Sequence, residues 1–305
     1  MWGKRRYNSL DYYLKEQFGE KLYKISLNGG MTCPNRDGKL GYGGCIFCSG
    51  GSGDFASPPG DIVMQIEKAK TLISEKYSGN RFIAYFGSYT NTYGETGYLR
   101  KLFYDVIERE ETAVLDIATR PDCLEPEKLE LIEELNRIKP VWIELGLQTA
   151  DDTTARLINR GYPTEAYDRA VSDLKRTGVH IITHMIAGLP GESEEDMIRT
   201  ARHIAAAGSD GIKIQLLHIL RGTALEKMYN EGSIRVMTEE EYISTVVKLI
   251  SVIPGDMVIH RLTGDGDKKI LAAPLWSCNK RRVLNLINHR LKTENILQGC
   301  NTDAR

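Results

Sequence analysis

Net charge, long apolar runs and cysteine are all scarce in this sequence of 305 residues. The 41 acidic side chains outnumber the 40 lysines and arginines by one. This balance argues against a broadly electropositive surface, so contact with nucleic acid would have to rest on a local basic patch. No segment is apolar enough to span a bilayer, and the charges at residues 4–6 are not followed by the apolar stretch of a secretory signal. We therefore expect a cytoplasmic protein that does not associate with a membrane.

Only six cysteines are present, and half of them lie in one glycine-rich loop as Cys33-x11-Cys45-x2-Cys48. Glycine lets such a loop fold back on itself, so the three thiolates can converge. The other cysteines are scattered, which in a reducing compartment makes disulfides a poor explanation. A structural zinc site takes four ligands, and no fourth is near. An iron–sulfur cluster with one open iron fits three cysteines best, and zinc remains the alternative.

The rest of the chain alternates extended and helical patterns. Strands are predicted at residues 22–27, 81–86, 113–119, 141–147, 179–187 and 211–218. Helices are predicted at 61–77, 126–138, 164–177, 193–208 and 238–253, with capping signals at the start of the last two. This alternation predicts an α/β fold with a parallel sheet and right-handed crossovers, a partial (β/α)6 TIM-like barrel. We expect an N-terminal arm at 1–21, a barrel core at 22–220 and a C-terminal extension at 221–305.

Polar residues recur on one face of four predicted strands. Buried parallel strands usually read as continuous apolar runs, so polar inner positions indicate a lumen that holds a polar ligand. Each position taken alone is better explained as a structural group, but four strands together favour a site at the carboxyl-end mouth of the barrel, where the cysteine loop also lies. The residues are Asp116, Arg120, Glu144, Gln148, His180, His184, Lys213 and Gln215.

Several motifs in this order resemble the radical S-adenosylmethionine (SAM) superfamily over about residues 22–220. They are the cysteine loop, Gly87-Ser-Tyr-Thr90, Glu144-Leu-Gly-Leu-Gln-Thr149, Ile158-Asn-Arg160-Gly161 and His184-Met-Ile-Ala-Gly-Leu-Pro-Gly191. The branches it resembles are those of coproporphyrinogen dehydrogenase and the elongator catalytic subunit, and above all the bacterial YhcC/YtqA type. The segments typical of that type are 32–38, 51–55, 89–93 and 119–122.

The resemblance implies a [4Fe-4S] cluster and SAM as cofactors, with Cys33, Cys45 and Cys48 as iron ligands. It implies that a 5′-deoxyadenosyl radical is generated and removes a hydrogen from the substrate. It also implies that Arg160 binds the SAM carboxylate, that Glu144 and Gln148 hydrogen-bond the cofactor, and that His184 meets the ribose. Phe47 would shield the cluster, and Gly87, Ser88 and Thr90 would approach the methionine group. Core packing is as good an explanation for Phe47, a plain turn for residues 87–90, and a surface ion pair for Arg160.

The segment 268–292 contains seven lysines and arginines with Trp276 and no acidic residue. A solvated helix face is the default explanation, and a patch for RNA phosphates is the functional one. The first hypothesis is therefore a radical SAM enzyme acting on tRNA, plausibly converting a wobble-uridine carboxymethylaminomethyl group towards aminomethyl. Flavodoxin or ferredoxin would be its reducing partner. The alternatives are a small-molecule or porphyrin-like substrate, and a zinc-binding nucleic-acid module.

Overall fold

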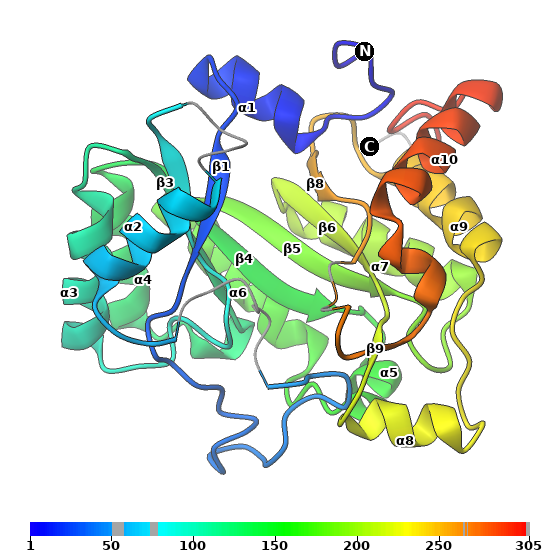
Figure 1. The fold of residues 1–305 in the computed structure, drawn as a ribbon, viewed down its shortest axis with the longest axis horizontal. Helices are drawn as coiled ribbons and strands as arrows, with labels where there is room; N and C mark the ends of the chain where they lie inside the picture. Colours follow the sequence, from blue (N-terminus) through cyan, green and yellow to red (C-terminus); the bar gives the residue numbers. More distant parts are fainter. Residues whose placement is uncertain (51–57, 74–78, 265, 267, 303–305) are drawn as a thin grey trace.

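The computed structural model describes residues 1–50, 58–73, 79–264, 266 and 268–302. The segment 51–55 and the last residues of the predicted helix 61–77 lie outside this part of the chain. A single seven-stranded parallel sheet runs through the molecule in the order β1-β2-β3-β4-β5-β6-β8 (Figure 1). The six predicted strands are confirmed as β1 (Tyr23–Leu27), β2 (Phe82–Phe86), β3 (Thr112–Thr119), β4 (Val141–Gln148), β5 (His180–Ala187) and β6 (Gly211–Leu216). The seventh, β8 (Val258–Arg261), was not predicted, because four residues carry too little periodicity.

Helices follow the strands. They are α2 (Ile62–Ile73), α3 (Thr96–Ile107), α4 (Pro126–Asn136), α5 (Asp152–Leu157), α6 (Thr164–Thr177), α7 (Glu194–Ala207), α8 (Ala224–Asn230), α9 (Glu239–Val252) and α10 (Lys280–Thr293). Most of them cover the outer face of the sheet, whereas α10 packs against α9 and α8 packs against residues 219–220. The predicted capping boxes open α7 at Ser193 and α9 at Thr238. Left-handed glycines end α6 at Gly178 and α7 at Gly208. Local sequence therefore fixes the ends of these helices.

The largest core lies between the sheet and these helices. Alternate residues of β4 (Val141, Ile143, Leu145 and Leu147) belong to it and are at most 1% exposed, while Trp142 belongs to a separate cluster on the other face. The two faces of β4 thus pack in different clusters, as strand periodicity requires. The inner face is therefore available to line a lumen.

The inner face is strongly curled. Lys24 on β1 reaches Glu144, three strands away on β4, with 2.7 Å between Nζ and Oε1. In a flat sheet these strands would lie roughly 14 Å apart, since neighbours are separated by about 4.8 Å. The sheet is therefore a half-barrel, which confirms the predicted partial TIM-like barrel.

The N-terminal arm closes the base of this half-barrel. Its helix α1 (Leu10–Phe18) places Leu14 in a cluster with Leu22, Ile83, Val114 and Trp142. The C-terminal extension supplies β8 and a two-stranded antiparallel sheet of β7 (Ile219–Leu220) and β9 (Leu271–Ala273). Two short 3-10 turns, η1 (Pro121–Cys123) and η2 (Leu275–Cys278), complete the fold.

Candidate active site at the mouth of the half-barrel

The lumen is built in layers along the strands. Its base is aromatic: His180 stacks on Tyr13 with 5.4 Å between ring centroids and also lies 5.4 Å from Trp142. His260 packs edge-on against the same Trp142. These groups come from α1, β4, β5 and β8 and leave the carboxyl-end mouth as the open side. His180 therefore lies in the base of the barrel, as a structural residue would.

A charged layer lies above this base, and Glu144 is its centre. Glu144 accepts hydrogen bonds from Lys24, Lys213 and the Nε2 atom of His184, the last at 2.7 Å. Lys24 also pairs with Asp116, which is fully buried. Five strands thus contribute to one network, in which two lysines, two carboxyl groups and a histidine are paired with one another.

The electrostatics of this layer follow from burial and from the partners. Burial disfavours the charge of Glu144, but Lys213, Lys24 and His184 outweigh it and hold its pKa well below the usual range. Burial and the neighbouring Glu144 raise the pKa of Asp116 to about 7. Burial and Lys213 lower the pKa of His184 to about 4, so its ring is neutral at pH 7. Gln215 donates to Nδ1 of that ring at 3.0 Å, so both of its nitrogens are bonded to protein, and the ribose contact stays a prediction.

The cysteine loop lies at the mouth and is tied down by backbone contacts. The Asn35 side chain donates to the carbonyl of Asn159 at 2.6 Å, and the Asn159 side chain donates to the carbonyl of Gly44 at 2.8 Å. Gly44 itself has φ +81°, a conformation that favours glycine. The loop is therefore bound to the segment that follows α5.

Nitrogen donors surround the three sulfurs. Asn35 Nδ2 lies 4.0 Å from Cys45 Sγ, Arg36 Nη1 lies 3.6 Å from Cys48 Sγ, and Arg120 Nη1 lies 4.0 Å from Cys33 Sγ. Hydrogen bonds of this kind to cysteine sulfur adjust the potential of an iron–sulfur cluster. No three His, Cys, Asp or Glu side chains within the described ranges are grouped to hold a single metal ion.

The protonation of Cys45 depends on its surroundings. Burial, followed by the neighbouring sulfur of Cys48, raises the pKa of Cys45 to about 11. At neutral pH this side chain is therefore a thiol unless a bound metal removes its proton. All three cysteines are free of disulfides and partly exposed, so the loop suits a cluster carried at its surface.

The turn after β2 lies beside the loop. Thr90 N–H donates to the carbonyl of Thr32 at 3.2 Å, which joins the turn to the residue before Cys33. Ser88 and Thr90 are buried, and a Cβ added to Gly87 would stand 2.2 Å from the Tyr85 ring. The turn therefore requires glycine for packing, and its contact with SAM stays a prediction.

Gln148 ends β4 with an unusual backbone and an unsatisfied side chain. Its φ is +68°, and its Oε1 atom is buried without a hydrogen-bond partner in the part of the chain that the structure describes. A buried amide oxygen left unpaired costs free energy, so a ligand that donates to it would be stabilised. This orphaned acceptor at the mouth fits the predicted cofactor contact.

Arg160 is enclosed by the protein, and its contact with the SAM carboxylate stays a prediction. It is 1% exposed and donates to the carbonyls of Leu147, Thr149 and Tyr162, and its Nη2 atom contacts Asp152 and Thr164. Every guanidinium nitrogen is therefore engaged within the protein. Arg36 and Arg120 are the cations next to the cysteine sulfurs, and Arg120 is held by Asp122 at 2.7 Å.

Phe47 packs into a small core that joins the loop to the C-terminal extension. Its neighbours there include Ile186, Leu217 and Leu225, and Leu225 N–H donates to the carbonyl of Ile46 at 2.9 Å. The aromatic ring is therefore anchored by residues on both sides of position 220. Shielding of the cluster by Phe47 stays a prediction.

Two protein-family models match this chain. The model described as the Radical SAM superfamily matches residues 32–204, and that of the Radical_SAM C-terminal domain matches residues 209–293. The chain belongs to the radical SAM superfamily. It is accordingly an enzyme whose cofactors are a [4Fe-4S] cluster and SAM.

The chain is also similar to individual proteins. The chain is 41% identical to YtqA of Bacillus subtilis, covering 97% of this chain and 92% of that protein. It is 35% identical to YhcC of Escherichia coli (strain K12), covering 94% and 92%. A tRNA uridine(34) acetyltransferase of Methanocaldococcus infernus is 29% identical over 155 residues, half of this chain and 28% of that one. The structure of Elp3 from the same archaeon superposes with TM-score 0.68 at 17% identity, covering 91% of this chain and 64% of that one, and it shares the fold.

In this radical SAM protein the loop residues Asn35 and Arg36, and Asn159 after α5, were not predicted as site residues. Arg120 was predicted as a polar residue of the lumen, but its contact with the cysteine loop was not predicted. Asn35, Arg36 and Arg120 fall in segments typical of the YhcC/YtqA type, which was the available signal. Their roles depend on contacts across the fold and could not be derived from spacing. No helix among the described residues is both long and apolar enough to cross a bilayer.

Proposed function

We propose that this radical SAM enzyme modifies the side chain of the wobble uridine in tRNA, converting a carboxymethylaminomethyl group towards aminomethyl. The observation that carries the substrate assignment is the likeness to a tRNA uridine(34) acetyltransferase over half of the chain. Cys33, Cys45 and Cys48 hold the cluster. The cofactors supply a 5′-deoxyadenosyl radical that removes hydrogen from carbon, and the protein positions the groups and excludes water.

The lumen supports this assignment through its charges. Lys24 and Lys213 suit the carboxylate of a carboxymethylaminomethyl group, and Glu144 and Asp116 suit its ammonium. A substrate that carries both charges can exchange partners with the existing ion pairs and leave no charge unpaired. The enzyme would act in the cytoplasm, with flavodoxin or ferredoxin as electron donor.

Nucleoside analysis of tRNA from a deletion strain tests this function. We expect the carboxymethylaminomethyl uridine derivatives to accumulate and the aminomethyl ones to fall. Complementation with the wild-type chain or with Cys300→Ala should restore the pattern, whereas Cys45→Ala should not. Cys300 is the matched control because it is an exposed free thiol outside the loop. Unchanged uridine nucleosides in the deletion strain would refute the tRNA assignment.

A further inference from the structure

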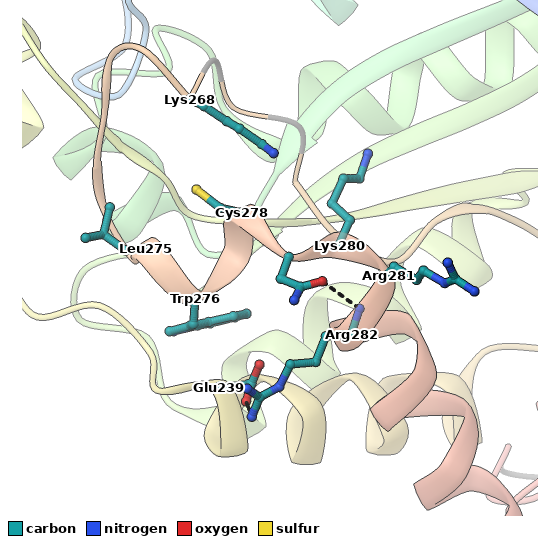
Figure 2. Close-up of a pocket in the computed structure, with 9 residues that line it drawn as sticks. Glu239, Lys268, Leu275, Trp276, Cys278, Lys280, Arg281 and Arg282 are labelled. Carbon is teal, nitrogen blue, oxygen red and sulfur yellow. Dashed lines mark hydrogen bonds and ion pairs between the residues drawn. The ribbon is translucent and has the colours of Figure 1, made fainter.

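A basic pocket lies between the loop before β9 and the start of α10. It has a volume of about 600 Å³, and Lys268, Lys280 and Arg281 line it together with Leu275 and Trp276. Figure 2 shows Lys268 entering from one segment and Lys280, Arg281 and Arg282 from the first turn of α10. We call these residues the basic pocket. Its volume falls in the range of pockets that bind small ligands or single nucleotides.

The ion pairs of α10 divide the lysines and arginines of the segment 268–292 into paired and unpaired residues. Arg282 pairs with Glu239 at 2.8 Å and Arg290 pairs with Glu240 at 2.5 Å, so these cations hold α10 against α9. Lys268 and Arg281 are exposed and make no ion pair or hydrogen bond within the described residues. The side chain of Lys292 is likewise exposed and without such a partner among the described residues, but it lies at the other end of α10, so two unpaired cations of this segment lie at the pocket.

The floor of the pocket is fixed in place. The indole N–H of Trp276 donates to the carbonyl of Met237 at 3.1 Å, and its ring lies 5.6 Å from that of Tyr242. Leu275 beside it is 67% exposed and adds apolar surface to the floor. Cations above an apolar, partly aromatic floor suit a ligand that has both phosphates and flat rings.

The pocket is also connected to the mouth of the half-barrel through packed segments of the chain. β9 pairs with β7, which follows the carboxyl end of β6, and Ala273 packs in the small core that contains Phe47 of the cysteine loop. Met237, whose carbonyl accepts the hydrogen bond of Trp276, also packs against Gly188, the residue after β5. A Cβ added at Gly188 would lie 2.9 Å from the Met237 side chain. A polymer bound in the pocket would therefore lie on the same side of the protein as the cysteine loop.

We propose that the basic pocket binds phosphates of an RNA strand next to the nucleotide that enters the lumen. This inference rests on the proposed function and adds the surface that holds the substrate. Lys268 and Arg281 neutralise backbone phosphates, and Leu275 with the Trp276 ring contacts a nucleotide base. RNA is favoured over an acidic protein because the cations surround a concave apolar floor and do not form a flat charged face.

Binding of an in vitro transcribed tRNA with uridine at the wobble position, measured by fluorescence anisotropy over a salt series, tests the proposal. We expect Lys268→Ala/Arg281→Ala to weaken binding roughly tenfold and to reduce the slope of log K against log salt by about 1.4–1.8, since each phosphate contact contributes about 0.7–0.9. The matched control is Lys68→Ala/Arg137→Ala, two exposed cations of α2 and the end of α4, far from α10 (Figure 1). It should leave both quantities unchanged.

The outcomes separate this proposal from the proposed function. If the wild-type chain binds tRNA and the pocket variant binds equally well, the basic pocket is refuted while the tRNA function stands. If the wild-type chain cleaves SAM but binds no tRNA, both fail together. If the variant keeps tRNA binding and loses reduction by flavodoxin, the pocket is a docking site for the electron donor and this proposal is overturned. Equal melting temperatures would confirm that the variants are folded.

Discussion

Single side chains in this protein take their roles from the contacts that surround them. Arg120 and Arg160 both contact the Tyr162 ring, and the guanidinium carbon of each lies within 4.7 Å of the ring centroid. Arg160 is enclosed by carbonyl oxygens, whereas Arg120 extends to a cysteine sulfur. The first arrangement links segments of the fold, and the second brings a cation next to the cysteine loop.

Replacing Arg160 by methionine tests this distinction. We expect the free energy of unfolding to fall by several kcal/mol, because each buried carbonyl left unpaired costs about 1–3 kcal/mol. SAM affinity of the protein that remains folded should change little. Urea denaturation and SAM binding measure the two effects, with Arg137→Met, at an exposed ion pair, as the control. A loss of SAM affinity with unchanged stability would instead support the role inferred from the sequence.

At the scale of strands, the charged layer shows how the half-barrel tolerates buried charge. Each of its strands presents one polar residue, and none of these residues is satisfied by its own strand. The network forms only when β1, β3, β4, β5 and β6 curl together. The layer therefore couples the registers of these strands to one another.

Removing the charge of Glu144 should be strongly destabilising. We expect Glu144→Gln to lower the free energy of unfolding by about 3–5 kcal/mol, since Lys24 and Lys213 would lose the buried carboxylate that they share. The double variant Glu144→Gln/Lys213→Met should cost less than the sum of the single changes. Glu134→Gln, at a half-exposed pair with Arg100, should change stability by less than about 1 kcal/mol. Strict additivity at Glu144 and Lys213 would contradict the network.

The aromatic base predicts a pH dependence of stability. Burial, the largest cause, lowers the pKa of His180 to about 4, against roughly 6.5 in the unfolded chain. Between these values the unfolded state binds the extra proton, so this contribution to stability is complete above pH 6.5 and is lost as the pH falls towards 4. We expect His180→Phe to show a shallower decline in melting temperature from pH 7 to pH 4.5. Parallel curves for the two proteins would refute this assignment.

For the whole molecule, the C-terminal extension is integral to the half-barrel. It supplies the edge strand β8, the helix α9 over the outer face, and the Leu225 contact to the cysteine loop. The predicted division at residue 220 therefore cuts through the sheet and through the small core around Phe47. The boundary itself stays a prediction.

A chain shortened to residues 1–220 tests whether the core folds alone. We expect it to aggregate or to lose cooperative unfolding, because the β6 edge and the apolar surface under α9 would be exposed to water. Circular dichroism and size-exclusion chromatography against the full chain would show this. A monomeric fragment with a cooperative transition would show that the predicted boundary separates an independent domain.

The sequence by itself determined the elements with strong local signals. Strand periodicity gave β1 to β6, capping residues gave the ends of α6, α7 and α9, and cysteine spacing with its neighbouring motifs indicated the cluster loop and the family. These features depend on residues within a few positions of one another. The tertiary structure alone decided which polar groups meet. It pairs Glu144 with two lysines and surrounds Arg160 with carbonyl oxygens. It also brings Arg120 to the cysteine loop and leaves two cations unpaired beside Trp276. Those outcomes depend on how far the sheet curls and on which side chains compete for each partner, and neither is encoded in local spacing.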